Sequence, residues 1–380
     1  MNKTTKIIIG IIIVVIIIVG VWYGVSKKQT PSSEKEPIKI GFMGPFSGYA
    51  AQFGEMMERG LNLALSELPE ETRERIKIIK EDDRCDPIAG LNAAQKLIQI
   101  DKVNYVIGPL CSAEVAIPTE HLFEDNKVIA LTVGLPPNKV ANMGPYHFSF
   151  SPEIEYLMKA LAKKVREDGI SKIAVIYTNG EFEVENRNHF IKYFKEFGGE
   201  VVADEAIERG TTDVRTPILK IKSKNPEAIF IGAHSGELIN ILRQLKELGL
   251  ENLPKYGIHA TENPVILSEA ADLAEGLIYP YPAEKNQSQS AIDYARKYRE
   301  MYNFDPDPYS ANVYDSLKIL VGAIEACGYE NKDCVLQKLS TIKDYPGANG
   351  LLSVDERGVG TYKEVMLKIV KNGKFEKLQK

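Results

Sequence analysis

The chain has 380 residues, a formal net charge of −5 and an ordinary content of glycine, proline and aromatic residues. This length is enough for more than one domain, each with its own hydrophobic core. The mildly acidic balance and the lack of a basic stripe argue against a nucleic-acid partner.

The N-terminal segment Ile7 to Val25 contains only Ile, Val, Gly, Trp and Tyr. It is about as long as a membrane-spanning helix, and Trp22 and Tyr23 lie near one end, as interface aromatics do. A cleaved signal peptide is the alternative, but its apolar region is usually shorter and ends in a small-x-small site. We therefore predict a membrane anchor over residues 1–28 and a short exposed linker over residues 29–37.

Strand-like and helix-like segments alternate from Ile38 onward. The first set predicts strands at 38–43, 76–80, 103–107 and 128–133, with helices at 54–68, 88–100 and 113–126. This order implies a parallel sheet flanked by helices.

The stretch Val103 to Glu114 joins a strand, a break and a helix start. Gly108-Pro109 ends the strand, and Ser112 occupies the position expected for a helix N-cap. A strand that turns directly into a helix N-terminus directs free N–H groups into one space, which suits an anion or a polar ligand head. In an open α/β sheet, ligands bind at the carboxyl ends of strands, where this turn lies. The alternative is that Ser112 is an ordinary helix cap.

A second α/β set of similar size begins at Ser151. It predicts strands at 172–177, 200–207, 228–232 and 255–259, and helices at 153–167, 186–197, 213–224 and 237–248. The remainder differs, with a strand or crossover at 277–282, helices at 291–302, 309–326 and 332–339, and a strand-rich tail over 350–378. Asn372-Gly373 in that tail predicts a hairpin turn.

The four cysteines fall into two local pairs. Cys85 and Cys111 each follow a strand at the same end of the first sheet, so they could meet, and Cys327 and Cys334 bracket a short loop between two helices. These pairings suggest two disulfides in an oxidising compartment. Three connectivities are formally possible; metal binding and four reduced, buried thiols are the alternatives.

No catalytic motif is found in the sequence. It lacks Gly-x-Ser-x-Gly, a P-loop, His-Glu-x-x-His and the dinucleotide pattern. Asp82 and Asp83 could form an acid pair, but we interpret them as turn and cap acids because adjacent residues at a strand end face opposite ways. His234 either reaches a ligand or lies at the cap of the next helix. We expect no enzyme activity, no cofactor and no metal.

The chain from Ile38 onward resembles the leucine/isoleucine/valine-binding proteins, the type I solute-binding proteins of ABC transporters. The resemblance rests on four stretches in the right order and spacing: 38–54, 81–87, 105–112 and 241–244. It implies two lobes, each a parallel sheet flanked by helices, joined by three crossovers and closing on a small solute. It also implies the disulfide Cys85–Cys111.

The same resemblance implies the ligand-binding residues. On the first lobe, it places Phe53 and Tyr309 at aromatic walls and Leu110, Cys111 and Ser112 at a turn that holds a ligand carboxylate. The second carboxylate turn matches residues 132–137, including Gly134 and Leu135, with Pro136 where the family usually has a hydroxyl. On the second lobe, Phe182 and His234 fall where Tyr is common. The acid that receives the ligand ammonium would fall near Ala260, and Glu262 is the nearest substitute.

The resemblance predicts a lobe of residues 38–150 and 280–349 and another of residues 151–279 and 350–380. It implies the extracytoplasmic solute-binding subunit of an ABC importer, held at the cell membrane by its N-terminal helix and partnered by a permease. The departures from the family pattern leave the solute open, because each unsatisfied polar group costs about 1–3 kcal/mol. Branched-chain amino acids are the family default, an amide or organic acid is the alternative ligand, and a sensor ectodomain is the alternative role.

Overall fold

The computed structural model describes residues 37–135, 138–284, 288–362 and 365–379, without the side chains of residues 112, 113, 141 and 284. The predicted anchor at 1–28 and all of the predicted linker except Pro37 lie outside these residues. Within the described ranges, no helix is both long and apolar enough to cross a membrane.

The first half of the described chain builds a parallel sheet with strand order β2-β1-β3-β4-β5. Its strands are β1 (Ile38–Gly44), β2 (Ile76–Asp82), β3 (Tyr105–Ile107), β4 (Ile129–Thr132) and β5 (His147–Ser149). The chain between them forms α2 (Ala51–Glu67), α3 (Glu70–Arg75), α4 (Pro87–Gln95), η1 (Lys96–Ile100), η2 (Ser112–Ala116), α5 (Ile117–Asp125) and α6 (Asn138–Ala141). The predicted parallel sheet is thus confirmed, and the short β5 was missed.

The second sheet repeats this arrangement and then extends it. Its order is β15-β14-β10-β9-β8-β6-β7. The strands are β6 (Lys172–Thr178), β7 (Glu200–Ile207), β8 (Ala228–Gly232), β9 (Lys255–Gly257), β10 (Ile278–Glu284), β14 (Val365–Lys371) and β15 (Lys374–Lys377). The strands from β6 to β10 are parallel, whereas β14 and β15 are antiparallel additions. The predicted hairpin at Asn372-Gly373 is confirmed, since both residues have positive φ and join β14 to β15.

Alternation along the strands places helices on both faces of the second sheet. Ile229 of β8 faces one core together with α9 (Arg215–Ser223), α10 (Ser235–Glu247) and α11 (Pro264–Ala274). Phe230, the next residue, faces the other core together with α7 (Ile154–Glu167) and α8 (Glu181–Glu196). Successive side chains of a strand point to opposite faces, so a strand covered on both sides is apolar throughout.

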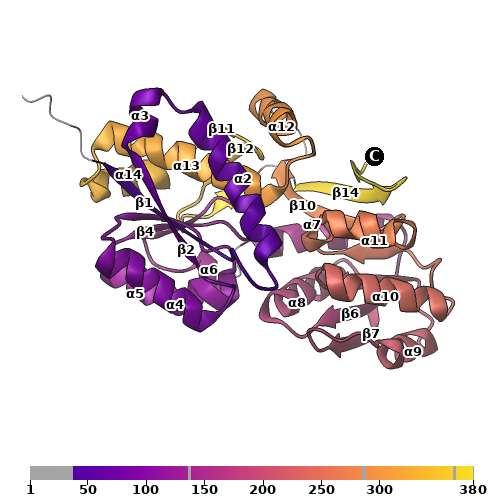
Figure 1. Ribbon diagram of the computed structural model, residues 1–380. Coiled ribbons are helices and arrows are strands. Elements are labelled where there is room, and N and C mark those ends of the chain that lie inside the picture. The colour runs from indigo at the N-terminus through magenta and orange to yellow at the C-terminus, as the bar shows by residue number, and fades with distance from the viewer. Residues whose placement is uncertain (1–36, 136–137, 285–287, 363–364, 380) are drawn as a thin grey trace, which may run out of the picture. The chain divides into compact units, whose positions relative to one another are not determined.

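Segments from the C-terminal third complete the core of the first sheet. They are α13 (Pro308–Cys327), α14 (Lys332–Ser340) and β12 (Gly350–Val354), and α12 (Gln289–Tyr302) precedes them. Helix α13 runs beside α2 (Figure 1). The two helices meet where Gly60 lies against the Ser310 backbone, with no room for a Cβ. The chain therefore returns to the first sheet after it has built most of the second.

The predicted lobe boundaries at 279/280 and 349/350 fall near these returns and stay a prediction. Pro280 lies inside β10, which pairs with β14 of the second sheet. Leu352 of β12 packs in the core of the first sheet. Two further short strands, β11 (Tyr345–Gly347) and β13 (Gly360–Thr361), pair with β12.

Candidate functional site

A cavity of about 570 Å³ lies at the carboxyl ends of strands from both sheets. The loops after β1, β2, β3 and β4 line it on one side, and the loops after β6, β7, β8 and β9 line it on the other. In both sheets the strand order reverses beside the strand that comes first in the sequence, which is β1 in one sheet and β6 in the other. Ligands of open α/β sheets bind in the crevice at such a reversal.

Most of the residues predicted to bind a ligand meet at this cavity. Those that line it are Phe53, Leu110, Cys111, Gly134, Leu135, Phe182, His234 and Tyr309. The backbone of Ser112 begins η2, and its side chain lies outside the described atoms. The structure therefore brings these residues together, while their contact with a ligand stays a prediction.

Glu262 was predicted as a substitute for the ammonium-binding acid, and the structure places it elsewhere. Its carboxylate accepts a hydrogen bond from the hydroxyl of Tyr279 and forms an ion pair with Lys368. Glu262 does not line the cavity. The prediction failed because Lys368 on β14, more than a hundred residues away in the sequence, forms an ion pair with this carboxylate.

Both predicted disulfides are present. Cys85 and Cys111 join the turns after β2 and β3 across a Cα–Cα distance of 5.4 Å, and both residues line the cavity. Cys327 and Cys334 join α13 to α14 across 5.7 Å. The first disulfide thus fixes two of the loops that form the cavity wall.

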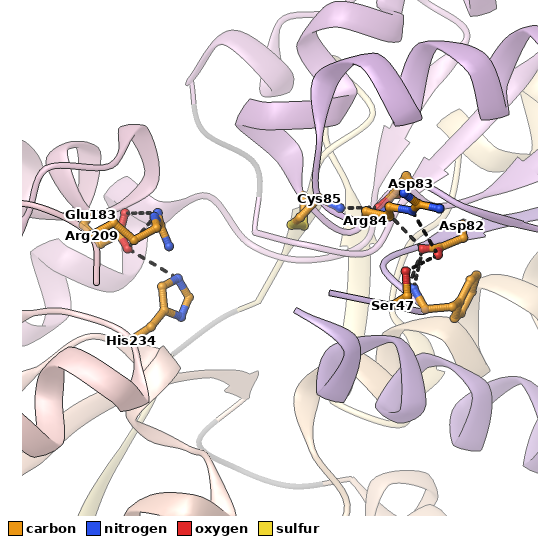
Figure 2. The surroundings of a disulfide bond; sticks show 10 residues. Ser47, Asp82, Asp83, Arg84, Cys85, Glu183, Arg209 and His234 are labelled. Carbon is orange, nitrogen blue, oxygen red and sulfur yellow. Dashed lines mark hydrogen bonds and ion pairs between the residues drawn. A yellow bond between two sulfur atoms is a disulfide. The ribbon is translucent and has the colours of Figure 1, made fainter. Parts of the chain in front are cut away.

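Asp82 and Asp83 act as turn acids, as predicted, whereas the cap of the following helix α4 is Asp86. Asp82 accepts hydrogen bonds from the Ser47 hydroxyl at 2.5 Å and the Phe46 amide at 2.9 Å (Figure 2). Asp83 accepts one from the Cys85 amide at 2.9 Å. Asp83 is fully buried and its other oxygen has no partner, so burial raises the pKa of Asp83 to about 7. These contacts hold the turn that carries the disulfide.

Five rings surround part of the cavity in a closed cycle. Phe53 contacts His234 and Tyr309, Phe182 contacts His234 and His259, and His259 contacts Tyr309, with centroid distances from 5.3 to 6.1 Å. All five line the cavity. We call these residues the five-ring cluster; its members come from both sides of the cavity.

The two imidazoles of the cluster are neutral near pH 7. Burial lowers the pKa of His234 to about 4 and that of His259 to about 3. Nε2 of His259 lies 3.0 Å from the Tyr309 hydroxyl, and Nε2 of His234 lies 3.5 Å from a carboxylate oxygen of Glu183. The cluster therefore presents uncharged rings to the cavity.

Glu183, Arg209 and His234 lie together on the second side of the cavity, opposite the turn that carries Cys85 (Figure 2). The carboxylate of Glu183 is fully buried and lies 3.3 Å from the guanidinium of Arg209. Burial raises the pKa of Glu183, while Arg209 opposes that shift. Gly180 permits this position, because a Cβ there would lie 2.3 Å from the Glu183 carboxylate.

Sequence reasoning missed the polar residues of this side, namely Glu183, Arg209, Glu237 and His259. Glu237 is buried and accepts a hydrogen bond from the Gly210 amide at 2.8 Å, so it joins the loop after β7 to the start of α10. A usable signal existed, because Glu183, Arg209 and Glu237 follow the carboxyl ends of predicted strands and His259 is the last residue of one.

The comparisons with known proteins agree with this geometry. The family described as periplasmic binding protein matches residues 37–373. A leucine-, isoleucine-, valine-, threonine- and alanine-binding protein of Pseudomonas aeruginosa is 24% identical over 335 residues, covering 86% of this chain and 88% of that protein.

Two solved structures share the fold. A leucine-binding protein of Thermotoga maritima superposes with a TM-score of 0.83 at 25% identity, covering 90% of this chain and 98% of that one. A solute-binding protein of an R. palustris ABC transporter, in complex with benzoate, superposes with a TM-score of 0.80 at 19% identity, covering 90% and 95%.

Proposed function

The chain belongs to the periplasmic binding protein family, and we propose that it is the extracytoplasmic solute-binding subunit of an ABC importer. The observation that carries this proposal is the cavity itself, which is lined from the strand ends of both sheets. A solute that contacts both sides binds the closed form better than the open one and shifts the population toward it. A permease can then distinguish loaded from empty protein by shape.

We propose a small polar or amino-acid-like solute. The family model and the P. aeruginosa relative, whose name includes leucine, isoleucine and valine, support an amino acid. An organic acid is the second candidate. It is supported by Glu262, which is engaged with Lys368 rather than free for a ligand ammonium, and by the benzoate complex of a protein with the same fold.

We also propose that residues 1–28 anchor the protein to the membrane and that the described residues lie on the extracytoplasmic side. The apolar run from Ile7 to Val25 supports the anchor. The two disulfides support an oxidising compartment. Protease added to intact cells should release the domain by cutting within 29–37; protection of that segment until lysis would contradict the orientation.

A thermal-shift screen tests the binding role. The panel is amino acids, amides and organic acids at millimolar concentration. A ligand present at about a hundred times its Kd should stabilise the protein by about 2.7 kcal/mol. If no member of the panel raises the melting temperature, the proposed role is contradicted.

A further inference from the structure

We propose that the solute carries a fully methylated, quaternary ammonium group, and that the five-ring cluster holds this cation. The inference rests on the proposed binding function and specifies its ligand class. Three independent features of the cavity support it: the arrangement of the rings, the charge of the lining, and the engagement of the polar atoms on the rings.

The arrangement of the rings suits a cation. In a closed cycle of five with centroid spacings of 5.3 to 6.1 Å, the rings lie on average no more than about 5 Å from the centre, within the range of about 6 Å at which cation–π attraction acts. Phe53, Phe182 and Tyr309 supply the benzene-type rings of the cycle, and Phe182 stacks on His234 at 5.7 Å. His234 and His259 are neutral near pH 7 and do not repel a cation.

The charge of the lining favours the same ligand. Arg209 is paired with Glu183, and Arg243 with Glu269 at 3.5 Å. Of the lining carboxylates, Glu114 and Glu237 have no ion-pair partner among the described residues. Three lining carboxylates, Glu114, Glu237 and Glu269, therefore face two guanidinium groups, which leaves a net negative environment. A positive group on the solute would balance part of it.

The polar atoms of the rings indicate which cation fits. A primary ammonium has three N–H donors that need acceptors, whereas a quaternary ammonium has no N–H and needs none. Tyr309 and His259 are hydrogen-bonded to each other, and Nε2 of His234 faces Glu183. Nδ1 of His259 is buried and has no hydrogen-bond partner among the described residues. Such a site favours a cation that is recognised by contact with the aromatic rings over a cation that is recognised by hydrogen bonds.

The test uses two probes of nearly equal shape that differ in charge. Glycine betaine carries a trimethylammonium group, and 3,3-dimethylbutanoate has a neutral carbon in place of the nitrogen. Calorimetry on the full chain should show betaine binding at least about tenfold more tightly. Equal or tighter binding of 3,3-dimethylbutanoate would overturn the inference, because it would show an apolar pocket without preference for charge.

A matched pair of variants tests the charge. Glu237→Gln keeps an oxygen for the Gly210 amide but removes the negative charge, so the preference for betaine over 3,3-dimethylbutanoate should fall at least about fivefold. Glu247→Gln removes a charge from the far end of the same helix, where Glu247 pairs with Arg215 outside the cavity, and should leave the preference unchanged. An unchanged preference in Glu237→Gln would count against the inference. A structural defect alone would weaken both probes equally.

The outcomes separate this inference from the proposed function. Tight binding of L-leucine without binding of betaine would overturn the methylated ammonium and leave the solute-binding role intact. Failure of betaine, L-leucine and the whole panel of amides and organic acids to bind would contradict both.

Discussion

The two sides of the cavity are stabilised by different physical means. The side built on the first sheet is largely uncharged, and the disulfide Cys85–Cys111 fixes two of its loops covalently. The side built on the second sheet carries Glu183, Arg209 and Glu237, which are held by ion pairs and hydrogen bonds. Lys368 and Glu262 form a further ion pair, outside the cavity lining, with side chains that are only 14% and 10% exposed. The first side should therefore respond to reduction, and the second to the loss of a charge.

Breaking the ion pair between Lys368 and Glu262 should give the largest loss in the free energy of unfolding. In Lys368→Met, Glu262 would keep its buried position without a cation, which should lower the free energy of unfolding by about 3–5 kcal/mol. The double variant Glu262→Gln/Lys368→Met should recover most of that loss, because no charge remains buried. Denaturant unfolding measures both.

Lys374→Met, at an exposed position on the neighbouring strand β15, is the control and should change the free energy of unfolding by less than about 0.5 kcal/mol. A loss below about 1 kcal/mol in Lys368→Met would show that the pair is more solvated than its burial indicates.

Removing the disulfides should give the next largest effect and separate stability from binding. Cys85 and Cys111 are 26 residues apart, so Cys85→Ser/Cys111→Ser should cost about 3.5 kcal/mol by loop entropy. Cys327 and Cys334 are 7 apart, and the corresponding double variant should cost about 2.4 kcal/mol. Only the first pair lines the cavity, so only its loss should also weaken solute binding. Equal effects on binding would contradict the role of the disulfide as part of the wall.

The pH dependence of stability should show a smaller effect from Asp83 on the first side. Its pKa is about 7 in the folded protein and about 3.9 in an unfolded chain, so the folded state holds its proton more tightly. The stability contributed by this proton is complete below about pH 4 and is lost as the pH rises through 7. Relative to Asp83→Asn, the wild type should lose about 2.6 kcal/mol between pH 5 and pH 8.

Melting curves of both proteins across this range provide the measurement. The buried His147 changes stability in the opposite direction in both proteins. Its folded pKa of about 4 lies below the value near 6.5 in an unfolded chain, so stability is lost as the pH falls from 6.5 to 4. This contribution cancels in the comparison. Parallel profiles for wild type and Asp83→Asn would show that Asp83 does not titrate in this range.

The sequence predicted the first side of the cavity better than the second for a physical reason. The strand, turn and helix start from Val103 to Glu114 are contiguous, so local patterns place Leu110 and Cys111 at the strand end. The polar contacts of the second side form between distant segments. Arg209 meets Glu183 across 26 residues, and Glu237 meets Gly210 across 27. No local pattern indicates such partners.

The failure at Glu262 has the same origin. Glu262 lies only two residues after Ala260 in the sequence, which suggested a ligand contact. The chain returns through β14, however, and places Lys368 beside Glu262. The alternation of strands and helices predicted both sheets because it reflects local periodicity. The antiparallel β14, which pairs with β10 at the end of the second sheet, depends on that late return.

Solution scattering on the protein with and without a validated solute tests the central claim, that a solute bound between the two sides closes them. Phe53 and Tyr309 already contact His234 and His259 across the cavity in this structure. We predict a smaller radius of gyration when solute is bound, with His234→Ala weakening both affinity and compaction and Phe53→Ala weakening mainly affinity. A solute that binds tightly without any change in the radius of gyration would contradict closure of the lobes.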